Sequence, residues 1–292
     1  MARKYGAPYV GSKNNIAEDV INFLPAGKRL CDLFGGGGAI THCALTYGRN
    51  KYESVLYNDV NPMVVDYVKN AFYGKYDMDV YEPEIITREK FHDLKTVRGD
   101  VAFLWSFGNN GIDYLWGKEI EENRIAAFAM LTRKSVSERY SYYKKFMSLM
   151  NKSGDESKSL TSAQTHIEVI ERANSISSIP SVERVQFTNI DYSEYEYEDG
   201  DVVYCDIPYE KIAKNTKVPY KKFDHKKFYD WAYSRPYPVY ISSYGINDSR
   251  FEAVAICMRR QLLCKTPDDG RIEFIYMNRA AVEEKSCEML ML

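Results

Sequence analysis

The stretch Asp206-Ile207-Pro208-Tyr209 combines residue types that suit chemistry on a flat, amino-bearing molecule. It directly follows a short apolar run, "VVYC", which predicts a strand. The carboxylate and the neighbouring backbone carbonyl can both accept hydrogen bonds from an amino group, and the proline turn fixes their directions. The tyrosine ring offers a face on which a heterocycle can stack. Because the motif is short, a strand-ending turn with a packed tyrosine is the alternative interpretation.

A run of four glycines, "DLFGGGGAI" at residues 32–40, follows another predicted strand and precedes a predicted helix. Glycines at such a place let the backbone approach a ligand closely at the amino end of a helix. The run lacks the third glycine of a dinucleotide fingerprint and the G-K-[ST] of a P-loop. We favour ligand binding over the alternative, a tight strand-to-helix turn.

Two further polar residues stand where they can contact a ligand. Asp59, in "YNDVNP", ends a predicted strand about twenty residues beyond the glycines. An acid there can bind ribose hydroxyls in a doubly wound fold, or it can cap the next helix. Lys13, in "PYVGSKNNI", can face an anionic group or be an ordinary surface lysine.

The segments that must position these residues predict an α/β core that an insertion divides. A strand, a loop and a helix recur in turn at residues 28–48 and 53–72, which is typical of βαβ units and a parallel sheet. Residues 122–150 predict one basic amphipathic helix, and residues 162–176 predict another helix. Strands return from residue 182, and "TPDDGR" predicts a final antiparallel hairpin. We expect a core of residues 1–75 and 181–292, with residues 76–180 inserted.

Composition excludes several classes of protein. The chain has 292 residues, a net charge of −2 and no run of eighteen apolar residues, and its first residues lack the apolar stretch of a signal peptide. We therefore expect a cytoplasmic protein. The six cysteines form no C-x-x-C pair and the four histidines lack the spacing of metal ligands, so we expect buried thiols, no disulfide framework and no metal.

The motifs "YVGSK", "FGGGG", "NDVNP" and "DIPY", in this order, resemble those of the adenine-N6 DNA methyltransferases related to the Dam methylases. The segments "SFGNN" and "VYISSY" are similar to those of phage and prophage members. The resemblance spans most of the chain and is weakest over residues 118–180. It implies a Rossmann-like sheet that uses S-adenosylmethionine, an inserted, mainly helical target-recognition region, and double-stranded DNA as substrate. A restriction-modification role with an endonuclease partner, and the oligomeric state, stay open.

The resemblance also implies a role for individual residues. Asp206 and the carbonyl of Ile207 accept hydrogen bonds from the adenine amino group, and Tyr209 stacks on the flipped base. The family has proline where Ile207 stands, but isoleucine retains the carbonyl and Pro208 keeps it extended. Lys13 pairs with the cofactor carboxylate, Asp59 binds the ribose, and Asp191 with Tyr192 contacts the adenine of the cofactor. The full cofactor-binding set is Tyr9, Lys13, Asp32, Phe34, Gly35, Gly37, Asp59, Asp191, Tyr192 and Asp206.

Two basic stretches are candidates for DNA binding in a chain that is slightly acidic overall. Residues 124–158 carry eight basic residues against three acids, and residues 211–227 carry seven lysines and one acid. We expect the first stretch to meet phosphates and treat the second as its rival. The residues expected on DNA are Arg124, Arg133, Lys134, Arg139, Lys214 and Lys217.

Three other functions compete with this interpretation. A cytosine-C5 methyltransferase needs a Pro-Cys pair, which the chain lacks. A nicotinamide oxidoreductase is disfavoured by the missing third glycine. The third is a catalytically degenerate methylase relative that binds DNA or cofactor without turnover. Ile207, in place of the family proline, would then indicate the loss of activity.

Overall fold

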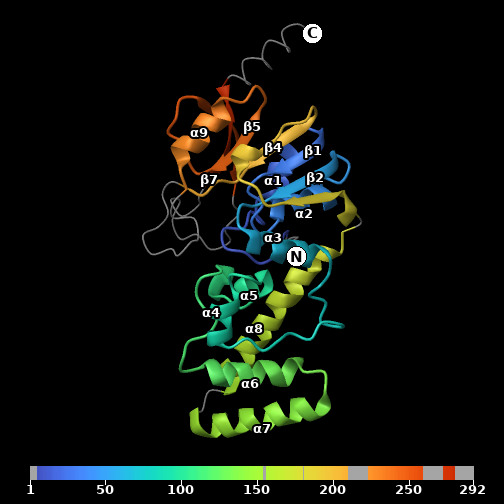
Figure 1. Ribbon diagram of the computed structural model, residues 1–292, viewed down its shortest axis with the longest axis vertical. Coiled ribbons are helices and arrows are strands. Elements are labelled where there is room, and N and C mark those ends of the chain that lie inside the picture. The colour runs from blue at the N-terminus through green and yellow to red at the C-terminus, as the bar shows by residue number, and fades with distance from the viewer. Residues whose placement is uncertain (1–4, 154–155, 180, 210–222, 259–271, 280–292) are drawn as a thin grey trace. The chain divides into compact units, whose positions relative to one another are not determined.

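The computed structural model describes residues 5–153, 156–179, 181–209, 223–258 and 272–279 (Figure 1). The chain forms two compact units. The first comprises residues 1–6, 11–65 and 179–292, and the second comprises residues 7–10 and 66–178. In the parts of the chain that are described, no helix is long and apolar enough to span a membrane.

A seven-stranded sheet in the order β3-β2-β1-β4-β5-β7-β6 forms the first unit. Its strands are β1 (Gly27–Asp32), β2 (Tyr52–Asn58), β3 (Val185–Thr188), β4 (Asp201–Cys205), β5 (Val239–Ser243), β6 (Phe251–Met258) and β7 (Ile272–Asn278). The strands from β1 to β5 pair in parallel, whereas β7 is antiparallel to both β5 and β6. The predicted parallel α/β core with an antiparallel end is therefore confirmed.

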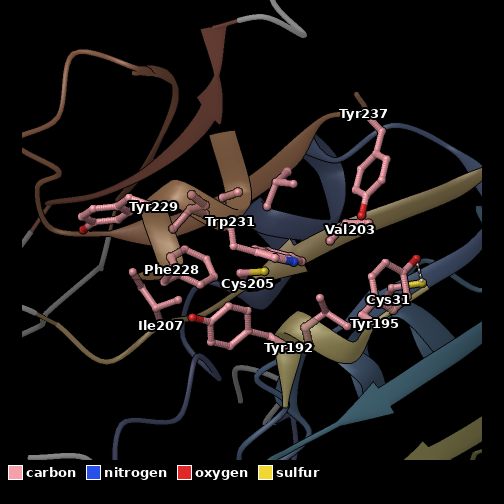
Figure 2. Close-up of a cluster of buried hydrophobic side chains, with 14 of the residues drawn as sticks. Cys31, Tyr192, Tyr195, Val203, Cys205, Ile207, Phe228, Tyr229, Trp231 and Tyr237 are labelled. Atoms are coloured by element: carbon pink, nitrogen blue, oxygen red, sulfur yellow. Dashed lines mark hydrogen bonds between the residues drawn. The ribbon is translucent and has the colours of Figure 1, made fainter. Parts of the chain in front are cut away.

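Helices cover both faces of this sheet because its central strands are apolar on both sides. Helix α9 (His225–Tyr233) packs its Phe228 and Trp231 on Val203 and Cys205 of β4, within one apolar cluster (Figure 2). Helices α1 (Ala17–Phe23) and α2 (Ala39–Thr46) pack against each other, and α2 also contacts β1 and β2. The ring of Phe23 on α1 lies 6.2 Å from that of Tyr240 on β5, centroid to centroid.

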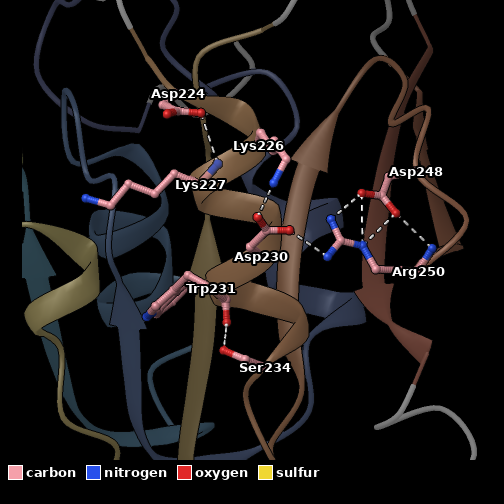
Figure 3. Close-up of polar contacts among 8 residues, drawn as sticks. All are labelled: Asp224, Lys226, Lys227, Asp230, Trp231, Ser234, Asp248 and Arg250. Carbon is pink, nitrogen blue, oxygen red and sulfur yellow. Dashed lines mark hydrogen bonds and ion pairs between the residues drawn. The ribbon is translucent and has the colours of Figure 1, made fainter.

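Polar contacts fix the position of α9 at the surface of the first unit. The carboxylate of Asp224 accepts the backbone N–H of Lys227 at 3.0 Å and so caps the helix. Asp230 forms ion pairs with Lys226 at 2.7 Å and with Arg250, just before β6, at 2.8 Å (Figure 3). Exposed ion pairs of this kind contribute little to stability, because solvent screens them.

The second unit is helical. It contains the later part of α3 (Pro62–Phe72), then α4 (Arg88–Leu94), α5 (Gly99–Leu104), α6 (Glu121–Thr132), α7 (Val136–Ser153) and α8 (Glu156–Asn174). Short 3₁₀ turns complete the two units at Phe107–Asn109, Ser175–Ser177, Val182–Arg184 and Tyr192–Glu194. The α6 helix packs against both α7 and α8.

The prediction of one long helix over residues 122–150 is wrong, because the chain breaks between α6 and α7. Arg133 adopts an extended conformation, with φ −62° and ψ 134°, which ends α6. The hydroxyl of Ser135 then accepts the backbone N–H of Glu138 at 3.5 Å and so caps the start of a new helix. The break lets the two helices pack against each other instead of extending as one rod.

Candidate functional site

The ends of β1 and β4 lie side by side at the centre of the sheet, since these strands pair in parallel with Asp32 opposite Tyr204. From β1 the sheet continues outward to β2 and β3, and from β4 it continues in the opposite direction. Ligands of doubly wound sheets usually bind at such a reversal of strand order. The glycine run follows β1 and the Asp206–Tyr209 motif follows β4, so the topology brings both predicted segments to this edge.

The glycine run has structural reasons of its own to contain glycine. Gly36 and Gly38 have φ values of 47° and 72°, in the left-handed region that favours this residue. A Cβ atom on Gly35 would lie 2.2 Å from Cε2 of Tyr57. The hydroxyl of Tyr57 donates to the carbonyl of Gly36 at 2.6 Å. The turn is therefore held by β2, and the contact of its glycines with a cofactor stays a prediction.

Asp59 lies just past the end of β2 and links that end to the glycine run. Its Oδ2 accepts the N–H of Gly36 at 3.1 Å and its Oδ1 accepts the N–H of Asn61 at 2.8 Å. Burial raises the pKa of this carboxyl to about 6, although the two backbone N–H groups lower it. Each carboxylate oxygen has a further lone pair, so Asp59 can still accept hydrogen bonds from a diol.

An aromatic cluster lies beyond the end of β3. Asp191 accepts the backbone N–H two residues on at 3.0 Å and so starts a short turn. The ring of Tyr192 stacks on that of Phe34, with centroids 5.6 Å apart and planes 28° apart. Ile207 is 2% exposed and packs into the same cluster (Figure 2). Because its side chain is turned into the core, what Ile207 can present to a ligand is its backbone.

Lys13 shares its ammonium between two carboxylates at the edge of the sheet. It is 6% exposed, and its Nζ lies 2.6 Å from Oδ1 of Asp206 and 2.9 Å from Oε1 of Glu273. It also donates to the hydroxyl of Tyr209. Since an ammonium has three donors, these partners saturate it. Pairing of Lys13 with a cofactor carboxylate, as the resemblance implies, requires one of these contacts to open.

Glu273 on β7 is a member of this cluster that the sequence analysis missed. It is 3% exposed. Its Oε1 also accepts the hydroxyls of Tyr209 at 3.1 Å and of Ser242 at 2.8 Å. One carboxylate oxygen therefore joins three segments that are far apart in the sequence.

Strand register explains why these side chains meet. Because β7 runs antiparallel to β5, with Ser243 opposite Phe274, the start of β7 reaches the edge at which the parallel strands end. The period of two residues in "RIEFIYMN" places Glu273 on the same buried face as Ile275 and Met277. An acid on the apolar face of a predicted strand was the signal in the sequence, because such a residue is seldom buried without a partner.

Lys13 favours the ionised form of Asp206, whereas burial and Glu273 make this carboxylate more basic than usual. Burial raises the pKa of Asp206, Lys13 lowers it and Glu273 raises it, to about 6 in all. Burial opposes the charge on Lys13, but the two carboxylates outweigh it and raise the pKa of the ammonium. Burial also raises the pKa of the Tyr209 phenol far above its usual value, so this hydroxyl stays a donor.

The ring of Tyr209 has an aromatic neighbour of its own. Tyr244, which follows β5, lies with its ring centroid 4.2 Å from that of Tyr209 and its plane 31° away. Stacking of Tyr209 on a base therefore requires the two rings to separate or to share the base between them. That role stays a prediction, and Tyr244 joins the candidates for it.

Two other residues of the expected cofactor set make their polar or ring contacts with residues outside this cluster. Asp32, at the end of β1, is 1% exposed and accepts the hydroxyl of Thr41 at 2.8 Å. Burial raises the pKa of its carboxyl to about 7. Tyr9 belongs to the second unit, where its ring centroid lies 5.4 Å from that of Phe103. Their contacts with a cofactor stay predictions.

The basic residues expected on DNA differ in how freely they can reach a ligand. Arg124 on α6 is 6% exposed. Arg133 pairs with Glu82 at 2.8 Å, and Lys134 donates to a backbone carbonyl at 2.7 Å. Burial restricts Arg124, and contacts within the second unit restrict Arg133 and Lys134. Their contact with DNA stays a prediction. Lys214 and Lys217 lie outside the described residues.

The α7 helix presents basic and aromatic side chains together to solvent. Arg139 is exposed, and Tyr140 and Tyr143 are 59% and 46% exposed. The two tyrosine rings stack with centroids 6.3 Å apart, and Nζ of Lys144 lies 4.9 Å from the ring of Tyr140. Such a face suits a polyanion, because guanidinium and ammonium groups bind phosphates and aromatic rings can stack.

A pocket of about 310 Å³ lies at the opposite edge of the sheet, where the strands begin. Its lining includes Arg29, which contacts Asp201 at 2.8 Å and Glu198 at 3.0 Å. Among the described residues, no group of three or more His, Cys, Asp or Glu side chains is arranged to hold a metal ion.

Comparison with known proteins adds independent findings. The DNA N-6-adenine-methyltransferase of Escherichia phage P1 is 25% identical over 281 residues, which is 90% of this chain and 33% of that protein. The chain thus spans about a third of the length of this relative. Two structures of the rRNA methyltransferase aviRa from Streptomyces viridochromogenes, 14% and 15% identical, each cover 92% of this chain and 84% of theirs. Their TM-score of 0.35 is too low to bear on the fold.

The match to a protein family is more extensive. The model of the D12 class N6 adenine-specific DNA methyltransferases matches residues 9–236, well over half of the chain. That range contains the lysine, the glycine run, the acid after β2 and the "DIPY" motif described above. The chain belongs to the D12 class N6 adenine-specific DNA methyltransferase family.

Proposed function

We propose that this protein transfers a methyl group from S-adenosylmethionine to the N6 amino group of adenine in double-stranded DNA. The observation that carries this proposal is the carboxylate of Asp206. It lies just past the end of β4, the strand next to the one that leads into the glycine run, and the ammonium of Lys13 at 2.6 Å favours its ionised form. Family membership disfavours the degenerate alternative, in which the chain binds its ligands without turnover.

The residues at the sheet edge fit the proposed cofactor. When bound, S-adenosylmethionine supplies an activated methyl group whose carbon–sulfur bond breaks with the electron pair going to sulfur. Asp59 offers carboxylate lone pairs to the ribose diol. The stacked rings of Phe34 and Tyr192 offer an apolar face beside Asp191 for the adenine. The glycine run would line the ligand between them.

Asp206 has two tasks in the proposed reaction. With the carbonyl of Ile207 it accepts hydrogen bonds from the adenine amino group, which draws the nitrogen toward tetrahedral geometry and exposes its lone pair. The nitrogen then forms a bond to the methyl carbon and becomes positively charged until it loses a proton. Asp206 accepts this proton and passes it to water. Alignment of the two reactants supplies most of the acceleration, and no covalent enzyme intermediate is needed.

The DNA must present its target base outside the helix, since the amino group of a paired adenine is not accessible to the site. We assign the phosphate contacts to the exposed face of α7, chiefly Arg139 and Lys144. Base-edge contacts within residues 76–180 would select the target sequence. A double-stranded DNA substrate is consistent with a cytoplasmic location.

The proposal is tested by incubating the protein with methyl-labelled S-adenosylmethionine and adenine-containing duplex DNA, and then digesting the DNA to nucleosides. The label is expected in N6-methyladenine. Label found only in cytosine, RNA or protein would overturn the assignment. Binding of DNA and cofactor without any transfer would instead support the degenerate alternative.

A further inference from the structure

Glu273 is a buried carboxylate at the candidate site to which the reaction proposed above gives no task. We propose that Glu273 is a positioning residue, which holds Lys13 between two carboxylates and so keeps Asp206 available to the adenine amino group. This inference rests on the proposed function. It concerns the last strand pair of the sheet, which lies outside the matched range of residues 9–236.

The geometry supports this role because Lys13 has a second partner that competes with Asp206. Its Nζ lies 2.9 Å from Oε1 of Glu273 and 2.6 Å from Oδ1 of Asp206. Without Glu273, Asp206 would be the only carboxylate that pairs with the ammonium of Lys13. That carboxylate would then be a weaker acceptor, because a stronger ion pair favours its ionised form.

Glu273 is itself rigidly held. Its Oε1 accepts the hydroxyls of Ser242 and Tyr209 at 2.8 and 3.1 Å, in addition to Lys13. Removing a buried carboxylate with several donors leaves those donors unpaired. A simple stabilising role thus predicts a loss of folding stability, whereas a positioning role also predicts a change in how Asp206 takes up protons.

The sign of that change follows from the charges around Asp206. Burial raises the pKa of Asp206, Lys13 lowers it, and Glu273 raises it. Removing the charge of Glu273 should therefore lower the pKa of Asp206. The titratable groups that face the two carboxylates are Lys13, Asp32, Tyr204, Cys205, Tyr209 and Cys257. Asp32, with a pKa of about 7, is present in every variant, so a difference between variants reports Glu273.

The kinetic test compares the pH dependence of kcat for wild type, Glu273→Gln and Glu273→Asp. In Glu273→Gln we expect kcat at pH 8 to fall roughly tenfold and its acid limb to move to lower pH, because a less basic Asp206 is a poorer proton acceptor. Glu273→Asp retains the charge, so its acid limb should stay near that of the wild type. Asp230→Asn removes an exposed carboxylate from α9 of the same unit, and it should change neither quantity.

A purely structural role predicts a different result. Glu273→Gln would then lower the melting temperature and reduce kcat by the same factor at every pH, with an unmoved acid limb. That outcome would overturn the proposal. Cofactor affinity, measured by calorimetry, should stay the same or rise in Glu273→Gln, because Lys13, the expected partner of the cofactor carboxylate, loses a competing carboxylate.

A second readout does not depend on turnover. The carboxyl carbon of Asp206 can be followed by NMR in protein with ¹³C-labelled aspartate, and its signal assigned by its absence in Asp206→Asn. The titration midpoint should lie at lower pH in Glu273→Gln than in wild type. An unmoved midpoint would reject the role of Glu273 even in an active enzyme. A moved midpoint in a protein that methylates no adenine would reject the proposed function alone.

Discussion

Charged side chains at the carboxyl edge of the sheet are buried, whereas those on the surface of α7 are exposed to solvent. Lys13 and Glu273 are 6% and 3% exposed, and each contacts several partners. On α7, Arg139 and Lys144 extend into solvent. Buried charges depend strongly on one another, and removing one leaves the others uncompensated. Exposed charges act through a field that salt screens. The first region should therefore control the rate, and the second should control salt-dependent affinity.

The largest effect is expected at the buried edge. Asp206→Ala removes one acceptor for the adenine amino group and should lower kcat by about a hundredfold or more, since one preorganised contact to the reacting group is worth on the order of 3 kcal/mol. Asp206→Asn should lose less, because an amide oxygen still accepts a hydrogen bond. The measurement is single-turnover methyl transfer at saturating cofactor and DNA.

The matched control for this prediction is Asp230→Ala. Asp230 belongs to the same unit, but it is exposed on α9 and pairs only with surface cations among the described residues (Figure 3). It should retain nearly full activity. Equal activity of Asp206→Ala and Asp230→Ala would show that "DIPY" is only a turn and would remove the distinction between the two regions.

The sequence predicts which segments meet at the buried edge, but not what they bind. Parallel strands place everything that follows them at one edge, so recognising the strands is enough to locate Asp59 and Asp206. Glu273 is not located in this way, because its neighbour Lys13 lies near the other end of the chain and antiparallel pairing of β7 brings the two together. Ligand binding by the glycine run stays a prediction, and contact with Tyr57 and the left-handed backbone account for much of its glycine content.

The helical unit was less predictable for a physical reason. Amphipathic periodicity indicates that a helix forms, but it does not say where a short capping sequence will interrupt it, as Ser135 does before α7. Charge counting placed Arg124 and Arg139 in one basic stretch. The fold buries the first and exposes the second. A local charge run therefore does not determine which of its members can reach a ligand.

A second prediction concerns pH and again separates the two regions. Because Asp206 must be ionised to accept the proton of the adenine amino group and its pKa is about 6, kcat should fall about tenfold per pH unit below that value. DNA affinity should change little over the same interval, because arginine and lysine on α7 stay charged. A kcat that is constant down to pH 5 would contradict the ionisation assigned to Asp206.

A third prediction separates two tasks within the buried edge. Asp59→Ala removes the acceptor for the ribose diol and should raise the cofactor KM roughly tenfold, with a smaller change in kcat. Tyr209→Ala should leave cofactor affinity nearly intact and lower kcat. Calorimetry and steady-state kinetics on both variants check the pattern. The reverse pattern would show that the two roles have been exchanged.

The smallest effect on activity is expected on α7. Replacing Arg139 and Lys144 together by alanine should flatten the plot of log affinity against log salt concentration by up to about two units, one for each phosphate that the protein no longer neutralises. The weakening should be similar for cognate and unrelated DNA, because phosphate contacts carry no sequence information. Lys28→Ala serves as the control, since Lys28 is 64% exposed but lies at the start of β1, at the opposite edge of the sheet from the candidate site. An unchanged salt slope in the double variant would move the phosphate contacts to the lysines between residues 211 and 227. The segment that follows "DIPY" would then contribute to both the rate and the salt-dependent affinity, so these two properties would not be divided between the sheet edge and α7.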